Sequence, residues 1–257
     1  MNSNLRKTIA QIVHHSKEGH IPSSYSIVDI INYLYENILS FDCQNPNLDS
    51  RDYFILSKGH GCAALYVVLE KFGFISAKDL EQYGSPSGIL GGHPDMTKVP
   101  GAEASTGSLG HGFPTALGLA LGLRIQNNNN KIFCLMGDGE CHEGTIWESA
   151  NVGANQHLGN LCAIIDWNQS AAQLLPEDDL PARWRAFGWE THVIDGHSKE
   201  DMDKTFPKLK FSLEGRPKAI ICKTIKGKGV SFLEGHGIWH HRIPTSEELH
   251  QIDLELS

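Results

Sequence analysis

Two apolar runs near the middle of the chain lack the 3.6-residue spacing of an amphipathic helix. They cover residues 132–136 and 161–165, and each is flanked by polar residues or glycine. Short runs that are apolar throughout are typical of parallel strands buried on both faces. We therefore predict two parallel strands with a helix over about 145–157 between them. If the two strands are neighbours, their carboxyl ends lie side by side.

The alternation of helices and short strands extends over the rest of the chain. The further helices expected are at about 5–13, 27–39, 61–69, 180–187 and 199–209, and the further strands at 52–57, 190–194 and 217–223. This order predicts an α/β fold with a mostly parallel sheet flanked by helices. Because no internal repeat or low-complexity linker interrupts it, residues 1–257 are expected to form one domain.

The composition supports this prediction and narrows the range of partners. The chain has 257 residues, of which 40% are hydrophobic, enough to bury a full core. The net charge is −8 and the only basic cluster is Lys223, Lys226 and Lys228, so we do not expect nucleic acid as a partner. No run approaches the roughly eighteen apolar residues of a membrane span and no signal peptide is visible, so a cytoplasmic protein without a membrane partner is expected. The six cysteines form no CxxC pair and are expected to be reduced.

Candidate chemistry follows the ends of the predicted strands. The run at 132–136 ends in Gly137-Asp138-Gly139, and the run at 161–165 is followed by Asp166-Trp167-Asn168. A glycine-flanked turn at a strand end lets the backbone approach a phosphate group. Neighbouring strands would bring Asp138 and Asn168 together. The strand at 52–57 also ends in a turn, Lys58-Gly59-His60-Gly61, that could face a phosphate.

A carboxylate and an amide oxygen beside a phosphate site suit a magnesium ion. Mg²⁺ takes oxygen ligands and is usually bound through few protein groups, with phosphate and water completing its shell. The alternative is a Gly-Asp-Gly hairpin turn followed by an unrelated asparagine in a loop.

The spacing of this Gly-Asp-Gly and the asparagine about thirty residues later resembles the magnesium-diphosphate motif of thiamine diphosphate enzymes. Other stretches are similar to transketolases in particular. They are KEGHIPSSYS at 17–26, SKGHGCAALYVVLEKFG at 57–73, GGHP at 91–94, EASTGSLGHG at 103–112, GDGECHEGTIWESA at 137–150 and TIKGKGVSFLEGHGIWHH at 224–241. Together they resemble the diphosphate-binding domain with which transketolases begin.

The resemblance implies a set of site residues. The metal ligands are Asp138, Asn168 and the main-chain carbonyl of Ser170. The cofactor contacts are His60, Gly107, Ser108, Leu109, Gly137, Asp138, Gly139, Glu140, Asn168 and His236. The histidines that face substrate or assist proton movements are His20, His60, His93 and His240. Either His236 or His240 could be the histidine nearest the diphosphate.

Two further segments each allow two interpretations. The resemblance places Glu143 and Glu148 at a subunit interface that links paired active sites, whereas both could be solvated helix carboxylates. Asp195-Gly196-His197 resembles a family turn, and a plain β-turn explains it as well.

The resemblance further implies the activity and a partner. Thiamine diphosphate with Mg²⁺ would supply the chemistry that transfers a two-carbon ketol unit from a ketose, or ketose phosphate, to an aldose. The glutamate that activates the cofactor comes from a second, pyrimidine-binding domain, so this chain resembles the N-terminal subunit of a split transketolase. It would assemble with a C-terminal subunit, in the form α2β2. The alternatives are a subunit like deoxyxylulose phosphate synthase or a 2-oxo acid dehydrogenase, and a non-catalytic regulatory subunit that binds the cofactor.

Overall fold

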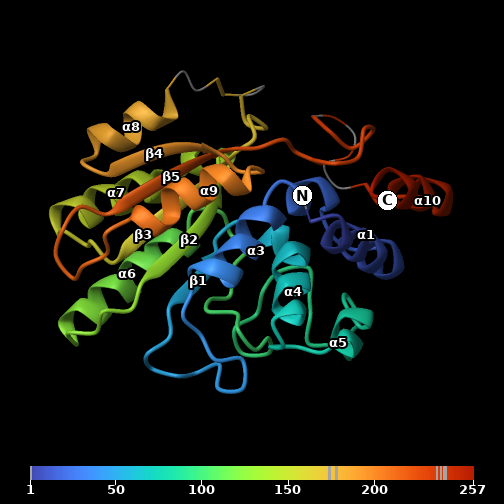
Figure 1. Ribbon diagram of the computed structural model, residues 1–257, viewed down its shortest axis with the longest axis horizontal. Coiled ribbons are helices and arrows are strands. Elements are labelled where there is room, and N and C mark those ends of the chain that lie inside the picture. The colour runs from blue at the N-terminus through green and yellow to red at the C-terminus, as the bar shows by residue number, and fades with distance from the viewer. Residues whose placement is uncertain (1, 173–174, 177–178, 236, 238, 240–241) are drawn as a thin grey trace.

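The computed structural model describes residues 2–172, 175–176, 179–235, 237, 239 and 242–257. These residues form a five-stranded parallel sheet with the strand order β1-β2-β3-β5-β4 (Figure 1). The strands are β1 (Tyr53–Leu56), β2 (Ile132–Gly137), β3 (Leu161–Trp167), β4 (Glu190–Asp195) and β5 (Lys218–Lys223). Each corresponds to a predicted strand, so the α/β fold with a parallel sheet is confirmed.

Burial on both faces explains why the central strands have no polar positions. All six residues of β2 are buried. Phe133 and Leu135 pack into the hydrophobic cluster on one face, whereas Cys134 and Met136 pack into the cluster on the other. A strand between two helical layers is therefore apolar at every position, as the sequence pattern indicated.

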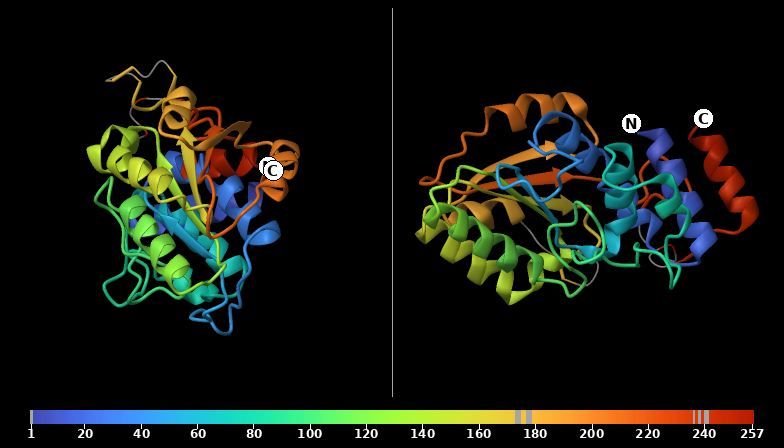
Figure 2. Two further views of the ribbon diagram at one scale, coloured as in Figure 1. Left: turned by 90° about the vertical axis from the view of Figure 1, so that its left-hand side faces the viewer. Right: turned by 90° about the horizontal axis from the view of Figure 1, so that it is seen from below.

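Helices cover both faces of the sheet (Figure 2). Their bounds are α1 (Ser3–Ser16), α2 (Ile21–Tyr25), α3 (Val28–Asn37), α4 (Cys62–Lys71), α5 (Ala77–Glu81), α6 (Gly112–Ile125), α7 (Gly144–Asn155), α8 (Leu180–Ala186), α9 (Lys199–Thr205) and α10 (Ser246–Glu255). Helices α3, α4 and α9 contribute to the hydrophobic cluster that contains Phe133 and Leu135. Helices α6, α7 and α8 contribute to the cluster on the opposite face, which contains Cys134 and Met136. The terminal helices α1 and α10 pack side by side (Figure 1).

Four helices were not expected from the sequence: α2, α5, α6 and α10. Helix α6 has the sequence GFPTALGLALGLRI, which is apolar or small on all sides and so shows no amphipathic stripe. Helices α5 and α10 begin with capping boxes, Ser76 with Asp79 and Thr245 with Glu248. These boxes were a local signal for both helix starts.

The register of the sheet decides what lies at its carboxyl edge. Gly137 of β2 pairs with Asp166 of β3, and Asp166 pairs with Cys222 of β5. The loops that follow β1, β2, β3 and β5 therefore leave the sheet next to one another. Among the described residues, no helix combines the length and the apolar character needed to cross a bilayer. All six cysteines are free thiols.

Candidate functional site

A cavity of about 300 Å³ opens at the carboxyl ends of four strands. It is lined by Ser23, Lys58, His60, Leu109, Gly137, Asp138, Gly139, Glu140, His142, Asn168, Ser170, Ala171, Leu175 and Lys226. The turn after β1 contributes Lys58, the turn after β2 Asp138, the loop after β3 Asn168, and the loop after β5 Lys226. Ligands of open parallel sheets bind at this edge.

Asp138 lies in the turn that ends β2, and its side chain is only slightly exposed. Its Oδ1 atom accepts a hydrogen bond of 2.7 Å from the Gly139 amide, and its own amide donates to the Asp166 carbonyl at 3.1 Å. Burial, and then repulsion by the Asp166 carboxylate, raise the pKa of Asp138 above its usual value. A bound cation would offset both effects.

Asn168 is oriented by its neighbours. Its Nδ2 donates to Asp166 Oδ2 at 2.9 Å, and its Oδ1 accepts from the Ser170 amide at 2.9 Å. Gln169 adopts a φ of +60°, so the chain turns directly after Asn168 and brings Ser170 to the cavity. The sequence expectation that Asp138 and Asn168 converge is confirmed, because both line the same cavity.

The donors gathered here fit a hard cation that also binds a phosphate. They include the Asp138 carboxylate and the Asn168 amide oxygen, which are ligand types of Mg²⁺. No cluster of three or more His, Cys, Asp or Glu side chains suited to a metal occurs in the part of the chain that the structure describes. A metal at this site would therefore share its coordination shell with a ligand and water.

Two buried lysines face the cavity, and neither was among the predicted site residues. Lys58 Nζ lies 2.6 Å from Asp166 Oδ2, and Lys226 Nζ donates to Ser170 Oγ at 2.8 Å. Burial and the nearby Lys58 ammonium lower the pKa of Lys226. Two ammonium groups beside a cavity suit a polyanionic ligand such as a diphosphate. The available signal was a lysine beside a glycine shortly after each predicted strand, directly after the strand in Ser57-Lys58-Gly59 and three residues after it in Ile225-Lys226-Gly227.

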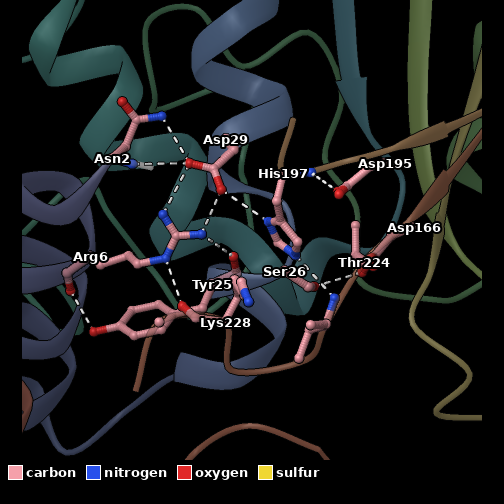
Figure 3. Close-up of polar contacts among 12 residues, drawn as sticks. Asn2, Arg6, Tyr25, Ser26, Asp29, Asp166, Asp195, His197, Thr224 and Lys228 are labelled. Carbon is pink, nitrogen blue, oxygen red and sulfur yellow. Dashed lines mark hydrogen bonds and ion pairs between the residues drawn. The ribbon is translucent and has the colours of Figure 1, made fainter. Parts of the chain in front are cut away.

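Asp166 connects these groups from the end of β3 and is fully buried. It accepts hydrogen bonds from Lys58, Asn168 and Ser26 on Oδ2 and from Thr224 on Oδ1 (Figure 3 shows the last two). Burial favours the neutral acid, but the Lys58 charge and these hydrogen bonds outweigh it and lower the pKa of Asp166. The ionised carboxylate therefore holds a lysine and the amide of Asn168 in place.

Glu140 lines the cavity, but its carboxylate serves the neighbouring loop at 107–112. Its Oε1 accepts from the Gly110 amide at 2.9 Å and from Ser57 Oγ at 2.5 Å. Burial raises the pKa of this carboxyl group. Leu109 of the same loop lines the cavity, whereas Gly107 and Ser108 lie outside its lining.

The predicted histidines fall into three groups. His60 lines the cavity. The His20 ring packs edge-on against the His60 ring, and the two ring centroids are 5.2 Å apart. His93 is exposed and lies against Gly107, where a Cβ atom would come within 2.9 Å of His93 Cδ2. Gly107 has a φ of +155°, so both space and backbone conformation favour glycine there. His236 and His240 lie outside the described residues.

Glu143 and Glu148 do not reach the cavity. Glu143 is the residue before α7 and Glu148 lies within that helix, and both are exposed to solvent. Their predicted role at a subunit interface stays a prediction.

Comparison with known proteins is consistent with this geometry. Residues 1–254 match the family described as the thiamine diphosphate binding domain of transketolase. The chain is 38% identical over 257 residues to one subunit of the apulose-4-phosphate transketolase from Phocaeicola vulgatus, covering 98% of this chain and 91% of the relative. It is 36% identical over 250 residues to a 6-deoxy-6-sulfo-D-fructose transketolase subunit from a Clostridium species, covering 95% and 90%.

Longer transketolases contain the same fold. Human transketolase is 34% identical over 258 residues, covering 98% of this chain but 41% of the human protein. The solved transketolase from Leishmania mexicana superposes with a TM-score of 0.90 at 26% identity, covering 99% of this chain and 40% of that one. The transketolase from Campylobacter jejuni gives a TM-score of 0.86 at 28% identity, with 99% and 46% covered. The chain thus spans about two fifths of these longer proteins.

Proposed function

Because the chain belongs to the transketolase family through its thiamine diphosphate-binding domain, we propose that it is the diphosphate-binding subunit of a split transketolase. Residues 1–257 form one such domain. Two relatives named as transketolase subunits match it over about nine tenths of their own length. The observation that carries the proposal is the cavity where Lys58, Asp138, Asn168 and Lys226 meet at four neighbouring strand ends.

In this proposal Asp138, Asn168 and the Ser170 carbonyl bind Mg²⁺, while Lys58 and Lys226 face the diphosphate. Main-chain groups of Gly137 and Gly139 contact the same diphosphate. The bound cofactor supplies the chemistry that breaks and forms the carbon–carbon bond next to a ketose carbonyl. The protein contributes position and charge: the lysines offset phosphate charge, and Asp166 keeps the Asn168 amide oriented.

The histidines act on the substrate side of the site. His60 lines the cavity and His20 packs against it, so we assign both to proton movements and to orienting substrate hydroxyl groups. His93 approaches substrate beside the loop at 107–112, whose glycines meet the aminopyrimidine ring of the cofactor. His236 and His240 follow on the segment after β5, and one of them faces the diphosphate.

The substrates are sugars or sugar phosphates. A two-carbon ketol unit passes from a ketose donor to an aldose acceptor. The relatives are named for apulose 4-phosphate and for 6-deoxy-6-sulfo-D-fructose, so donors with an anionic group are the first class to test. The five buried cysteine thiols suit the reducing cytoplasm.

The second half of the active site comes from a pyrimidine-binding subunit, in an α2β2 assembly around a two-fold axis. That subunit provides the carboxylate that activates the cofactor. Glu143 and Glu148 are exposed on and beside α7, as an interface role requires.

The test is a ketol-transfer assay with Mg²⁺ and thiamine diphosphate. It compares this chain alone, a pyrimidine-binding subunit encoded beside it, and the mixture, on ketose phosphates and 6-deoxy-6-sulfo-D-fructose. We expect activity only in the mixture, and sedimentation should give the mass of an α2β2 assembly. Full activity of the isolated chain would overturn the split-enzyme proposal. A mixture that binds the cofactor without turnover on any donor would favour the regulatory subunit instead.

A further inference from the structure

The turn that follows β4 contains a histidine with two defined hydrogen-bond partners. His197 Nδ1 lies 3.0 Å from Asp29 Oδ2, and its Nε2 lies 3.0 Å from the Ile225 amide nitrogen (Figure 3). An amide N–H can only donate, so Nε2 must be the acceptor. His197 is therefore the neutral Nδ1–H tautomer, which donates to the carboxylate and accepts from the backbone.

Asp29 is held as a buried anion. Arg6 Nη1 donates to its Oδ1 at 3.0 Å and Arg6 Nη2 to its Oδ2 at 2.6 Å, and the amide and side chain of Asn2 also donate to Oδ1. Arg6 is fully buried and Asp29 is 3% exposed. Burial alone favours the neutral acid, but the hydrogen bonds from His197 and Arg6 and the Arg6 charge lower the pKa of Asp29.

Arg6 also reaches the segment that His197 contacts. Its Nε atom donates to the Lys228 carbonyl at 2.8 Å, and its Nη2 to the Tyr25 carbonyl at 3.1 Å. His197 thus binds the backbone of the loop at 224–228 near its start, and Arg6 binds it at its end. Asp29 joins the two contacts, and Figure 3 shows all three side chains converging.

Lys226 lies between these two contacts. Its ammonium reaches Ser170 at the cavity although burial and Lys58 both disfavour its charge there. The neighbouring Ile225 is 40% exposed and gives this part of the loop little apolar packing. Hydrogen bonds therefore hold the loop in the conformation that brings Lys226 to the cavity.

We propose that Arg6, Asp29 and His197 form a positioning relay that fixes the loop at 224–228 and so presents Lys226 to an anionic ligand. The three residues do not line the cavity and act through the loop. That the anion is the cofactor diphosphate rests on the proposed function. The clamping of the loop rests on the hydrogen bonds alone.

The direct test is hydrogen–deuterium exchange on the purified full chain, in wild type and in His197→Ala, His197→Gln and His197→Asn. Glutamine can keep an acceptor for the Ile225 amide, whereas asparagine keeps only the donor to Asp29. We expect amide exchange at 225–228 to rise roughly fivefold or more in the Ala and Asn variants and to return toward wild type in Gln. The matched control is His192→Ala, on strand β4 just before the turn that carries His197, since His192 contacts Glu190 and not the loop.

A second measurement ties the relay to the ligand. In the assembled enzyme, His197→Ala should weaken the retention of thiamine diphosphate and Mg²⁺ by roughly fivefold to tenfold, and His197→Gln should restore part of it. Unchanged loop exchange in His197→Ala, or a rise spread evenly over β4 and β5, would overturn the relay. Failure of the wild-type assembly to retain the cofactor would overturn the proposed function, with the exchange data still deciding the relay.

Discussion

At the scale of single residues, the site is governed by buried carboxylates that differ in their partners. Asp166 is paired with Lys58 and stays ionised, whereas Asp138 beside it is raised in pKa by burial and by Asp166. The first organises the site, whereas the second carries a charge that its buried surroundings disfavour. A binding group that costs stability until its ligand arrives is common at functional sites.

The first prediction concerns Asp138→Asn. Removing the buried charge should stabilise the ligand-free chain by about 1 kcal/mol, because desolvation and repulsion by Asp166 disappear. The same change should abolish the Mg²⁺-dependent retention of thiamine diphosphate in the assembled enzyme. Thermal unfolding of the chain and equilibrium dialysis of the assembly measure the two effects. Asp49→Asn, at an exposed position, serves as the control. If the ligand-free Asp138→Asn chain were less stable than wild type, burial and repulsion by Asp166 would not be the cause of the raised pKa.

The second prediction concerns pH and Asp29. Its folded-state pKa is lower than its unfolded value, so its contribution to stability is present above about pH 4 and is lost as the pH falls through the folded pKa. Asp29→Asn should cost about 3 kcal/mol or more at pH 7, since it leaves Arg6 buried without its counter-charge. The difference in the free energy of unfolding between Asp29→Asn and wild type should shrink below about pH 4. Urea unfolding between pH 3 and pH 7 measures the free energy of unfolding of both proteins. If the difference between them stayed constant with pH, the ionisation of Asp29 would not be the source of this stability.

At the scale of elements, the site depends on backbone segments in direct contact. The turn Gly59–Gly61 after β1 packs on the segment around Thr106 and Gly107. A Cβ atom at Gly59 would lie 2.8 Å from the Thr106 carbonyl carbon and oxygen, and backbone atoms cannot move aside cheaply. This contact ties the histidine turn that carries His60 to the loop that carries Leu109.

The third prediction compares two glycines. Gly59→Ala should lower the free energy of unfolding by about 1–3 kcal/mol and weaken cofactor retention, because the two segments are forced apart. Gly118→Ala in α6 meets no atom within 4 Å and should stabilise the isolated chain by about 0.5–1 kcal/mol through helix propensity. Urea unfolding of both variants measures the contrast. Similar effects at the two positions would show that the Gly59 contact does not constrain the turn.

At the scale of the whole molecule, the cavity lies at one edge of a sheet in a chain that spans 41% of human transketolase. Four loops far apart in sequence line it, so it forms only when β1, β2, β3 and β5 are assembled. In the proposed function the remaining surface of the ligand is covered by the partner subunit. Folding, cofactor binding and assembly are then linked by mass action.

The fourth prediction tests that linkage through Glu148. Mixing with the pyrimidine-binding subunit should raise the unfolding temperature of this chain, and the rise should grow with protein concentration. Glu148→Lys should reduce the rise while leaving the isolated chain unchanged, because Glu148 is exposed on α7. Glu214→Lys, at another exposed position, is the control. Equal behaviour of the two variants in the mixture would place the interface elsewhere than at Glu148.

The strands and the turns that end them could be predicted from the pattern of apolar residues and glycines alone. A strand buried on both faces must be apolar at every position, which made 132–136 and 161–165 recognisable, and Gly137-Asp138-Gly139 marked a strand end. The predicted convergence of Asp138 and Asn168 followed from pairing those two strands. Helix α6 escaped prediction because its apolar residues surround the helix instead of forming a stripe.

Which distant side chains share a site depends on the order of the strands in the folded sheet. The order β1-β2-β3-β5-β4 places β5 next to β3, and this brings Lys226 to the cavity that Lys58 lines from the turn after β1. The partners of His197 likewise come from α3 and from the loop after β5. Periodicity reports whether a residue faces the core, but it carries no information on which strand ends become neighbours. That order is set by the packing of the helices on both faces of the sheet.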